Sequence, residues 1–144
     1  MRQNLLLRVA AKLLIPFIVL FALYVQFHGD FGPGGGFQAG VITAAAVVFY
    51  ALIVGLAEAR RVVPTELVES MMAIGVLVYG GTGLAGLLLG GQFLDYFVLD
   101  PDPVHGQHRG IFWVEVGVAI TVSGVMLKIF YMFADRATLD DDEE

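Results

Sequence analysis

The 144-residue sequence contains no cysteine and few charged residues. Disulfide bonds and thiolate metal sites are therefore excluded. Charged residues make up only 15% of the chain and hydrophobic residues 58%, a balance that excludes an ordinary soluble domain of this length. The sequence also lacks a basic patch with interleaved aromatic residues, so no nucleic-acid partner is expected. No nucleophile, base and orienting residue form a recognisable set, which argues against an independent enzyme.

What the sequence does contain is four apolar runs, each near the roughly 20 residues that a membrane-spanning helix needs. They predict helices at about 9–27, 39–57, 67–89 and 111–133. We therefore predict an all-α, polytopic membrane protein with four transmembrane helices in a single domain, residues 1–136. The first run is too long for a signal peptide and no cleavage site follows it, so we interpret it as a retained helix. The acidic segment 137–144 predicts a disordered tail.

The basic residues are distributed unevenly between the two ends of these helices. Those on one side lie before or within the first run, between the second and third, and at the end of the fourth: Arg2, Arg8, Lys12, Arg60, Arg61, Lys128 and Arg136. Only Arg109 falls on the other side. The positive-inside rule then predicts cytoplasmic N- and C-termini, with the segments 28–40 and 90–110 facing outward.

A glycine-rich turn punctuated by proline, residues 28–40, joins the first two predicted helices. Glycine permits sharp bends and close approach of the backbone. A formal match to a dinucleotide-binding pattern is rejected because a membrane helix, not a strand, precedes it. Two interpretations remain: a tight helical hairpin, or non-helical backbone at membrane depth whose N–H and C=O groups contact ions or a neighbouring subunit.

This turn resembles the signature of the MnhB/MrpB family, the B subunits of Mrp-type multisubunit cation/proton antiporters. The match is carried by Pro33, Gly34, Gly35, Gly36, Phe37, Gln38 and Gly40. The fourth run adds the segments 115–118 (EVGV) and 123–126 (SGVM). The sequence departs from the family at Asp30, where many members carry His or Asn.

The resemblance implies an accessory subunit of a Na⁺/H⁺ antiporter, needed for assembly and lining part of an ion path, in the cell membrane of a prokaryote. Its implied partners are membrane lipids and the other subunits, including large antiporter-like chains related to complex I. No cofactor is implied, since Na⁺ and H⁺ are the transported ions. The alternative is an MnhB-like subunit of a membrane-bound hydrogenase or another complex-I-related machine. A self-sufficient dimeric transporter is disfavoured because residues 9–27 contain no acid.

Ionisable residues within a membrane are costly, about 2.5–3.5 kcal/mol each on insertion scales, and mark functional candidates. Glu115 is the best candidate for an ion path, with a headgroup-level or subunit-paired carboxylate as the alternative. Lys128 is a second candidate, although a side chain that snorkels to the cytoplasmic surface is favoured. It lies 13 residues after Glu115, about 20 Å along a helix and on another face, so the two cannot pair.

The ends of the outward segments hold the remaining candidates. His28 and Asp30 form a possible proton or cation pair, although capping of the first helix by His28 is slightly favoured. His105 and His108 are weak evidence for metal, and no metal site is predicted. We expect Arg109 to pair with Asp102. At the head of the second helix, Phe37 and Gln38 are the predicted subunit contacts.

Overall fold

The computed structural model describes residues 2–29 and 31–141; these are mostly helical and contain no strand. Four of the helices are long and apolar enough to cross a membrane, which confirms the predicted all-α class. The elements in chain order are α1 (Arg2–His28), α2 (Gly36–Val54), α3 (Leu56–Val62), α4 (Thr65–Leu88), the 3₁₀ helix η1 (Tyr96–Leu99) and α5 (Pro103–Asp141).

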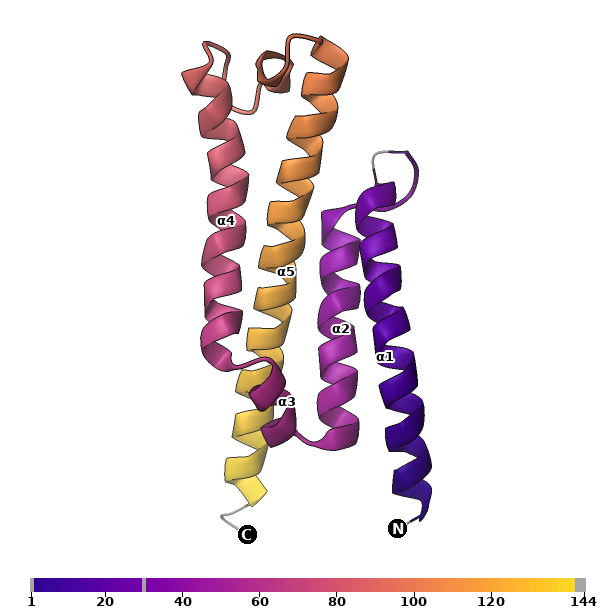
Figure 1. Ribbon diagram of the computed structural model, residues 1–144. Coiled ribbons are helices and arrows are strands. Elements are labelled where there is room, and N and C mark those ends of the chain that lie inside the picture. The colour runs from indigo at the N-terminus through magenta and orange to yellow at the C-terminus, as the bar shows by residue number, and fades with distance from the viewer. Residues whose placement is uncertain (1, 30, 142–144) are drawn as a thin grey trace.

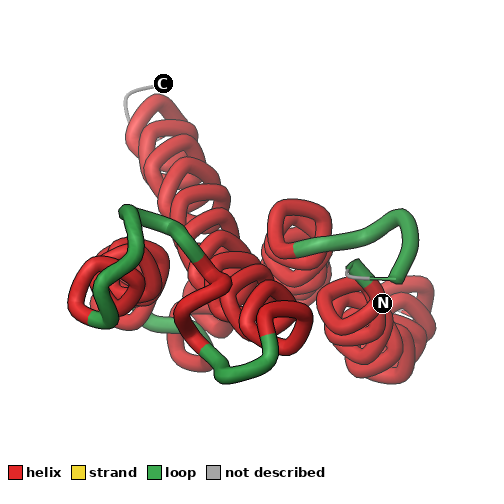
Figure 2. The backbone as a smooth tube through the Cα atoms, turned by 90° about the horizontal axis from the view of Figure 1, so that it is seen from above, coloured by secondary structure: helices red, strands yellow, loops and turns green. Residues whose placement is uncertain are grey.

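The long helices lie side by side in the order α4, α5, α2, α1, so that α5 packs between α4 and α2 while α1 packs mainly on α2 (Figure 1). Seen from above, α5 is inclined to its neighbours (Figure 2). The start of α1 and the end of α5 lie at the same end of the molecule (Figure 1). This agrees with an even number of spans, while the cytoplasmic location of that end stays a prediction.

Two helix boundaries differ from the predicted ones for identifiable reasons. α2 ends at Val54 rather than near residue 57 because Gly55 has φ 113°, and the short helix α3 follows. α5 begins at Pro103 rather than 111, with the Val104 amide donating to the Asp102 side chain at 3.0 Å as an N-terminal cap. The polar residues of this first stretch lower its hydropathy, so it does not stand out as part of an apolar run. At its other end α5 covers 137–141, part of the expected tail, while 142–144 lie outside the described residues.

Glycines bring α4 and α5 into close contact. A Cβ atom on Gly75 would overlap the Thr121 hydroxyl, and one on Gly117 would lie 2.8 Å from the Gly75 carbonyl oxygen. Gly124 lies equally close to α4, since its Cβ would be 3.0 Å from the carbonyl oxygen of Val68. Small residues allow such backbone contact in a bilayer, where the hydrophobic effect drives helix association only weakly. These small residues therefore pack helices within this chain.

The second interface of α5, with α2, follows the same principle. A Cβ on Gly40 would lie 2.8 Å from the Ala119 carbonyl oxygen. The buried Ser123 hydroxyl donates to the carbonyl oxygens of Gly40 at 3.1 Å and Ala119 at 2.7 Å. The two helices are thus held by van der Waals contact and by the interhelical hydrogen bond from Ser123.

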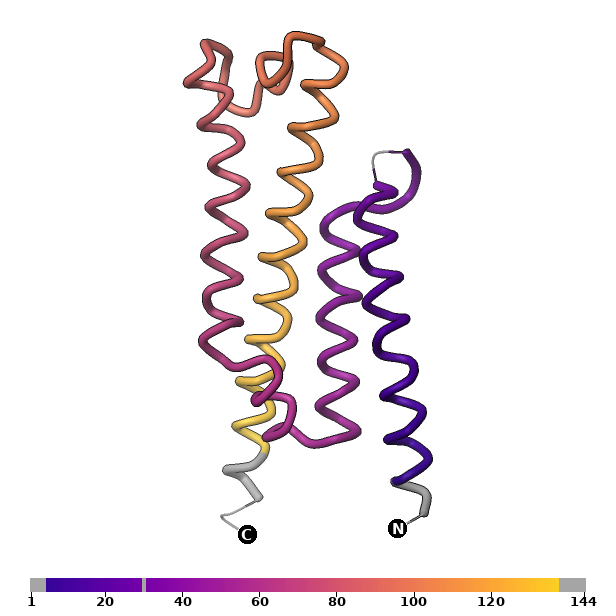
Figure 3. Tube along the Cα trace, in the orientation of Figure 1, coloured from indigo at the N-terminus to yellow at the C-terminus, as the bar shows by residue number. Residues whose placement is uncertain are grey.

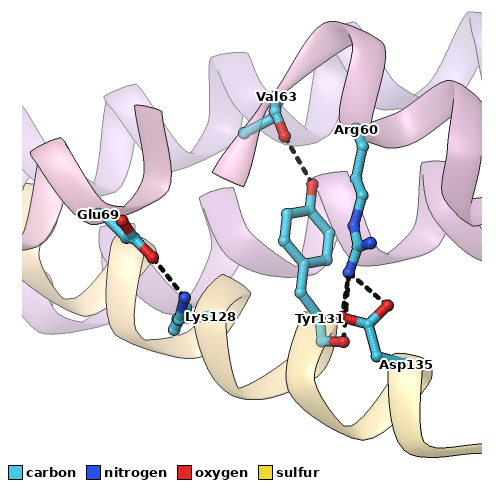
Figure 4. Close-up of polar contacts among 6 residues, drawn as sticks. All are labelled: Arg60, Val63, Glu69, Lys128, Tyr131 and Asp135. Atoms are coloured by element: carbon cyan, nitrogen blue, oxygen red, sulfur yellow. Dashed lines mark hydrogen bonds and ion pairs between the residues drawn. The ribbon is translucent and has the colours of Figure 1, made fainter. Parts of the chain in front are cut away.

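The end of the molecule near the termini is held by polar contacts of α3 and α4 with α5 (Figure 4). The buried Tyr131 hydroxyl donates to the Val63 carbonyl at 2.9 Å. Arg60 lies over the Tyr131 ring, 5.0 Å from its centroid, and donates to both carboxylate oxygens of Asp135 at 2.7 Å. These contacts surround a small apolar core of Ala44, Val68, Leu127 and Tyr131.

At the opposite end, the connection from α4 to α5 packs back on the helices. A Cβ on Gly110 would overlap the Tyr96 ring, and one on Gly83 would overlap the Phe93 ring. Burial raises the pKa of the Tyr96 hydroxyl, and nearby Tyr79 raises it further. This connection lies clearly beyond the turn between α1 and α2 (Figure 3).

Candidate functional site

The glycine-rich turn folds back onto the end of α1. The His28 carbonyl, at the end of that helix, accepts hydrogen bonds from the amides of Phe31 at 2.9 Å and Gly32 at 3.1 Å. The Gly35 amide then donates to the Val25 carbonyl at 3.2 Å. Gly35 has φ 124°, a conformation that other residues rarely adopt. Three backbone amides of the turn thus donate hydrogen bonds to carbonyl groups at the end of α1, and the turn redirects the chain into α2.

The same turn lies directly against Glu115 of α5. A Cβ on Gly36 would overlap the Glu115 carbonyl oxygen. The carboxylate also contacts the turn: a Cβ on Gly29 would lie 3.0 Å from its Oε2, and one on Gly35 2.9 Å from its Oε1. The missing side chains of these glycines therefore make the room that the Glu115 side chain occupies.

This contact lies far from the N-terminal end of α5. Glu115 lies 115 − 103 = 12 residues after Pro103, where α5 begins, which corresponds to about 18 Å along the helix. Figures 1 and 3 show the same relationship, since the turn stops well short of the connection between α4 and α5. Gly35 and Gly36 are thus buried against α5 while Phe31 and Phe37 are exposed, and the choice between a tight helical hairpin and backbone at membrane depth stays open.

A cavity of about 330 Å³ lies beside Glu115, between α1 and α5. Its walls combine aromatic rings with polar groups from both helices: Gln26, Phe27, Phe31, His108, Arg109, Phe112, Trp113 and Glu115. Gln26 is only 7% exposed, and its amide nitrogen and oxygen have no hydrogen-bond partner in the described part of the chain. Gln26 is not among the residues predicted from the sequence, although a lone amide near the end of an apolar run is a visible signal.

The other residues predicted at the turn have separate positions. The His28 ring stacks on Tyr24, one turn earlier in α1, with centroids 5.2 Å apart. Asp30 lies outside the described residues, so the predicted pairing with His28 stays untested. Phe37 and Gln38 are exposed at the start of α2, Phe37 by 62%. Their predicted role as subunit contacts is compatible with this exposure and stays a prediction.

Lys128 is remote from this site and has a partner of its own. Its Nζ lies 2.5 Å from Oε1 of Glu69 on α4, in a partly exposed pair near the end of the molecule that carries the termini (Figure 4). The structure therefore does not bring Lys128 together with Glu115.

The charged residues before and within the first turns of α5 pair differently from the prediction. Arg109 Nη1 lies 2.7 Å from Asp100 Oδ2, whereas Asp102 Oδ2 lies 3.0 Å from His105 Nδ1. The expected pair of Arg109 with Asp102 is therefore wrong. Asp102 caps the helix, and η1 packs along α5 so that Asp100 reaches Arg109. His108 stacks on Phe31, with centroids 6.4 Å apart.

Together, the four membrane-spanning helices and the close contact between the turn and Glu115 define a multi-pass membrane protein whose own helices pack closely on one another. A family model described as "Domain related to MnhB subunit of Na+/H+ antiporter" matches residues 6–128. The chain belongs to this MnhB family, as the resemblance of its turn indicated.

Relatives from two bacteria extend this similarity over most of the chain. The B subunit of the Na(+)/H(+) antiporter of Alkalihalophilus pseudofirmus is 30% identical over 130 residues, covering 83% of this chain and 90% of the relative. The protein of the same name from Bacillus subtilis is 30% identical over 133 residues, with the same coverage of both chains. The similarity therefore extends well beyond the turn that first indicated it.

Proposed function

We propose that this chain is a membrane subunit of a multisubunit Na⁺/H⁺ antiporter in the cell membrane of a prokaryote, with both termini cytoplasmic. The observation that carries the proposal is the family match over residues 6–128, which includes the turn and its contact residue Glu115. The uneven distribution of basic residues supports the orientation.

The arrangement of the helices supports a role within a complex. α1 contacts mainly α2 and carries many exposed apolar side chains, among them Leu6 at 74%, Leu13 at 66% and Phe17 at 63% exposure. The four long helices form a row (Figure 2) and expose many large apolar side chains, which we propose are covered by lipids and by the helices of other subunits. Large antiporter-like subunits related to complex I are the proposed partners.

The turn supports a more specific role. Phe31 is 79% exposed and Phe37 62% exposed, so two large rings project from backbone that is otherwise packed on Glu115. Exposed aromatic groups on a rigid support are typical contact residues of interfaces. We infer that the turn forms a junction with a neighbouring subunit, beside an ion path to which Glu115 contributes its carboxylate.

Exchange measurements test this function directly. The gene for this chain is deleted in its host, and inside-out membrane vesicles are energised while a fluorescent dye reports the proton gradient. Addition of NaCl is expected to dissipate the gradient in wild-type and complemented vesicles and to have little effect in the deletion strain. Equal sodium-dependent exchange in the deletion strain would exclude the proposed function.

A second measurement identifies the complex. The tagged chain is purified from its host in a mild detergent, and the copurifying proteins are identified by mass spectrometry. Large antiporter-like chains without redox subunits are expected. Iron–sulfur or nickel subunits would instead assign the chain to a membrane-bound hydrogenase or another complex-I-related machine, and recovery as an active homodimer would contradict both assignments.

A further inference from the structure

Two basic side chains near the start of α1 have no counter-charge within this chain. Arg8 and Lys12 are both exposed, and neither forms an ion pair with any residue that the structure describes. Three other basic residues at this end of the molecule each have a carboxylate partner at 2.5–2.7 Å, in the pairs Arg60–Asp135, Arg61–Glu58 and Lys128–Glu69. The positive charge near the start of α1 is therefore the part that the chain leaves uncompensated.

The composition of the neighbouring helices explains why these charges stay unpaired. Neither α1 nor α2, the helix on which α1 mainly packs, contains an aspartate or glutamate. Arg8 and Lys12 lie one turn apart on the same face of α1, where their Cβ atoms are about 5–6 Å apart and like charges repel each other. Helical side chains lean toward the N-terminus, so Lys12 extends toward the level of Arg8. An anion from outside α1 and α2 would relieve this repulsion.

A cavity beside Arg8 has room for such an anion. Its volume is about 190 Å³, and it lies between the start of α1 and the last turn of α2, lined by Leu7, Arg8, Leu52 and Ile53. Because a water molecule takes about 30 Å³ of liquid volume, the cavity accommodates a phosphate group together with some water. One wall is cationic and the others are apolar, so the cavity suits the headgroup end of an amphiphile.

The surface of α1 beyond the cavity is apolar. Pro16 and Val19 follow Lys12 on the same side of the helix, and both are exposed, Val19 by 36%. At the cavity itself Leu7 is 53% and Leu52 70% exposed. A basic group at the end of a membrane helix thus continues into an apolar strip, which is the chemical pattern of a phospholipid read from its headgroup to its acyl chain.

We propose that this cavity binds the phosphate of an anionic phospholipid, such as phosphatidylglycerol, between Arg8 and Lys12, with an acyl chain along Pro16 and Val19. Arginine donates to phosphate oxygens in a fixed fork, and lysine acts as a point charge. Basic pockets between membrane helices at the cytoplasmic surface bind anionic headgroups. The leaflet follows from the proposed orientation of the chain, whereas the site itself does not depend on the antiporter function.

Cross-linking in the reconstituted complex tests the site without requiring transport. The purified complex with its tagged subunit is placed in phosphatidylcholine vesicles that contain a small fraction of phosphatidylglycerol with a diazirine in its acyl chain, close to the headgroup. After illumination, the tagged subunit is digested and the labelled peptides are measured by mass spectrometry. The peptides that contain Leu7 and Leu52 are expected to be labelled several-fold more than by the same probe with a phosphatidylcholine headgroup. Sodium phosphate in the buffer is expected to leave this labelling unchanged.

Variants of the two basic residues decide whether labelling depends on them. Arg8→Gln and Lys12→Gln are each expected to lower labelling by the phosphatidylglycerol probe several-fold. Arg61→Gln is the matched control, because it removes one positive charge at the same end of the molecule from a residue that pairs with Glu58, and it is expected to leave labelling unchanged. Arg8→Lys combined with Lys12→Arg keeps both charges and is expected to retain the labelling, which separates loss of the site from a failure to assemble.

The remaining outcomes would overturn the site. Equal labelling by the two probes, or labelling that neither Arg8→Gln nor Lys12→Gln lowers, would show that the basic pair does not select an anionic lipid. Suppression by sodium phosphate would assign the cavity to free phosphate. Absence of labelling by both probes would show that another subunit covers the cavity. Each of these results, in complexes that still exchange sodium for protons, leaves the antiporter assignment intact.

Discussion

Gly36 at the start of α2 lies in backbone contact with Glu115 in α5, so close that a Cβ atom on Gly36 would overlap the Glu115 carbonyl oxygen. This contact joins the most characteristic segment of the sequence to the most prominent acidic residue among its apolar runs. It fixes the position of the turn along α5 and, through the turn, the environment of the Glu115 carboxylate.

Gly36→Ala is the first test of this relationship. The added methyl group must push α2 away from α5, and overpacking of this kind typically costs about 1–3 kcal/mol. We expect less of the subunit in membranes on a quantitative immunoblot and a lower thermal midpoint of the purified complex. Gly80→Ala is the matched control because a Cβ there meets nothing within 4 Å. Equal loss in both variants would show that the Gly36 contact is not the cause.

Phe37→Ala tests the junction at the turn. Phe37 is 62% exposed in this chain, so its removal is expected to leave the fold intact and to weaken contact with a neighbouring subunit. The measurement is the yield of partner subunits that copurify with the tagged chain, together with sodium-dependent exchange. Phe133→Ala, 70% exposed at the other end of the molecule, serves as control. Normal assembly and normal exchange would leave the turn as a hairpin only.

Lys128→Gln and Glu115→Gln separate the two ion-path candidates. Lys128 forms a partly exposed pair with Glu69, and such pairs contribute only about 0–1 kcal/mol. We therefore expect Lys128→Gln to preserve most of the exchange activity and Glu115→Gln to abolish it, both measured as sodium-dependent dissipation of the proton gradient in vesicles. Loss of exchange in Lys128→Gln together with retained exchange in Glu115→Gln would assign the ion path to Lys128 instead.

Tyr131→Phe tests the polar contacts between α3 and α5. The variant removes only the hydroxyl that donates to the Val63 carbonyl, and the loss of such a bond costs about 1 kcal/mol. We expect a lower thermal midpoint with unchanged exchange at growth temperature. Tyr24→Phe, at a position 58% exposed, is expected to leave the midpoint unchanged. A midpoint equal to that of the wild type for Tyr131→Phe would show that water replaces this bond.

Much of the fold follows from local properties of the sequence. Each apolar run is long enough to span a membrane, and each appears as a helix, because an isolated helix satisfies its own backbone hydrogen bonds in lipid. Boundaries were less predictable where polar residues stay helical, as in 103–110 at the start of α5, or where a single glycine such as Gly55 ends a helix.

Pairing between charged residues was predictable only in part. The expected pair of Arg109 with Asp102 was chosen from their proximity in the sequence. In the structure η1 packs along α5, so that Asp100 meets Arg109 while Asp102 caps the helix. The path of a connecting segment decides such choices, and hydropathy carries no information about that path.

The sequence by itself determined that this is a four-helix membrane protein of the MnhB family, because span length and the signature turn are properties of contiguous residues. Only the tertiary structure decided that Gly29, Gly35 and Gly36 make room for Glu115, and that the amide of Gln26 in α1 is buried without a hydrogen-bond partner among the described residues. Gly36 and Glu115, 79 positions apart in the chain, meet there because small side chains let α2 approach α5. Helix packing, not local propensity, therefore sets the chemistry of the site.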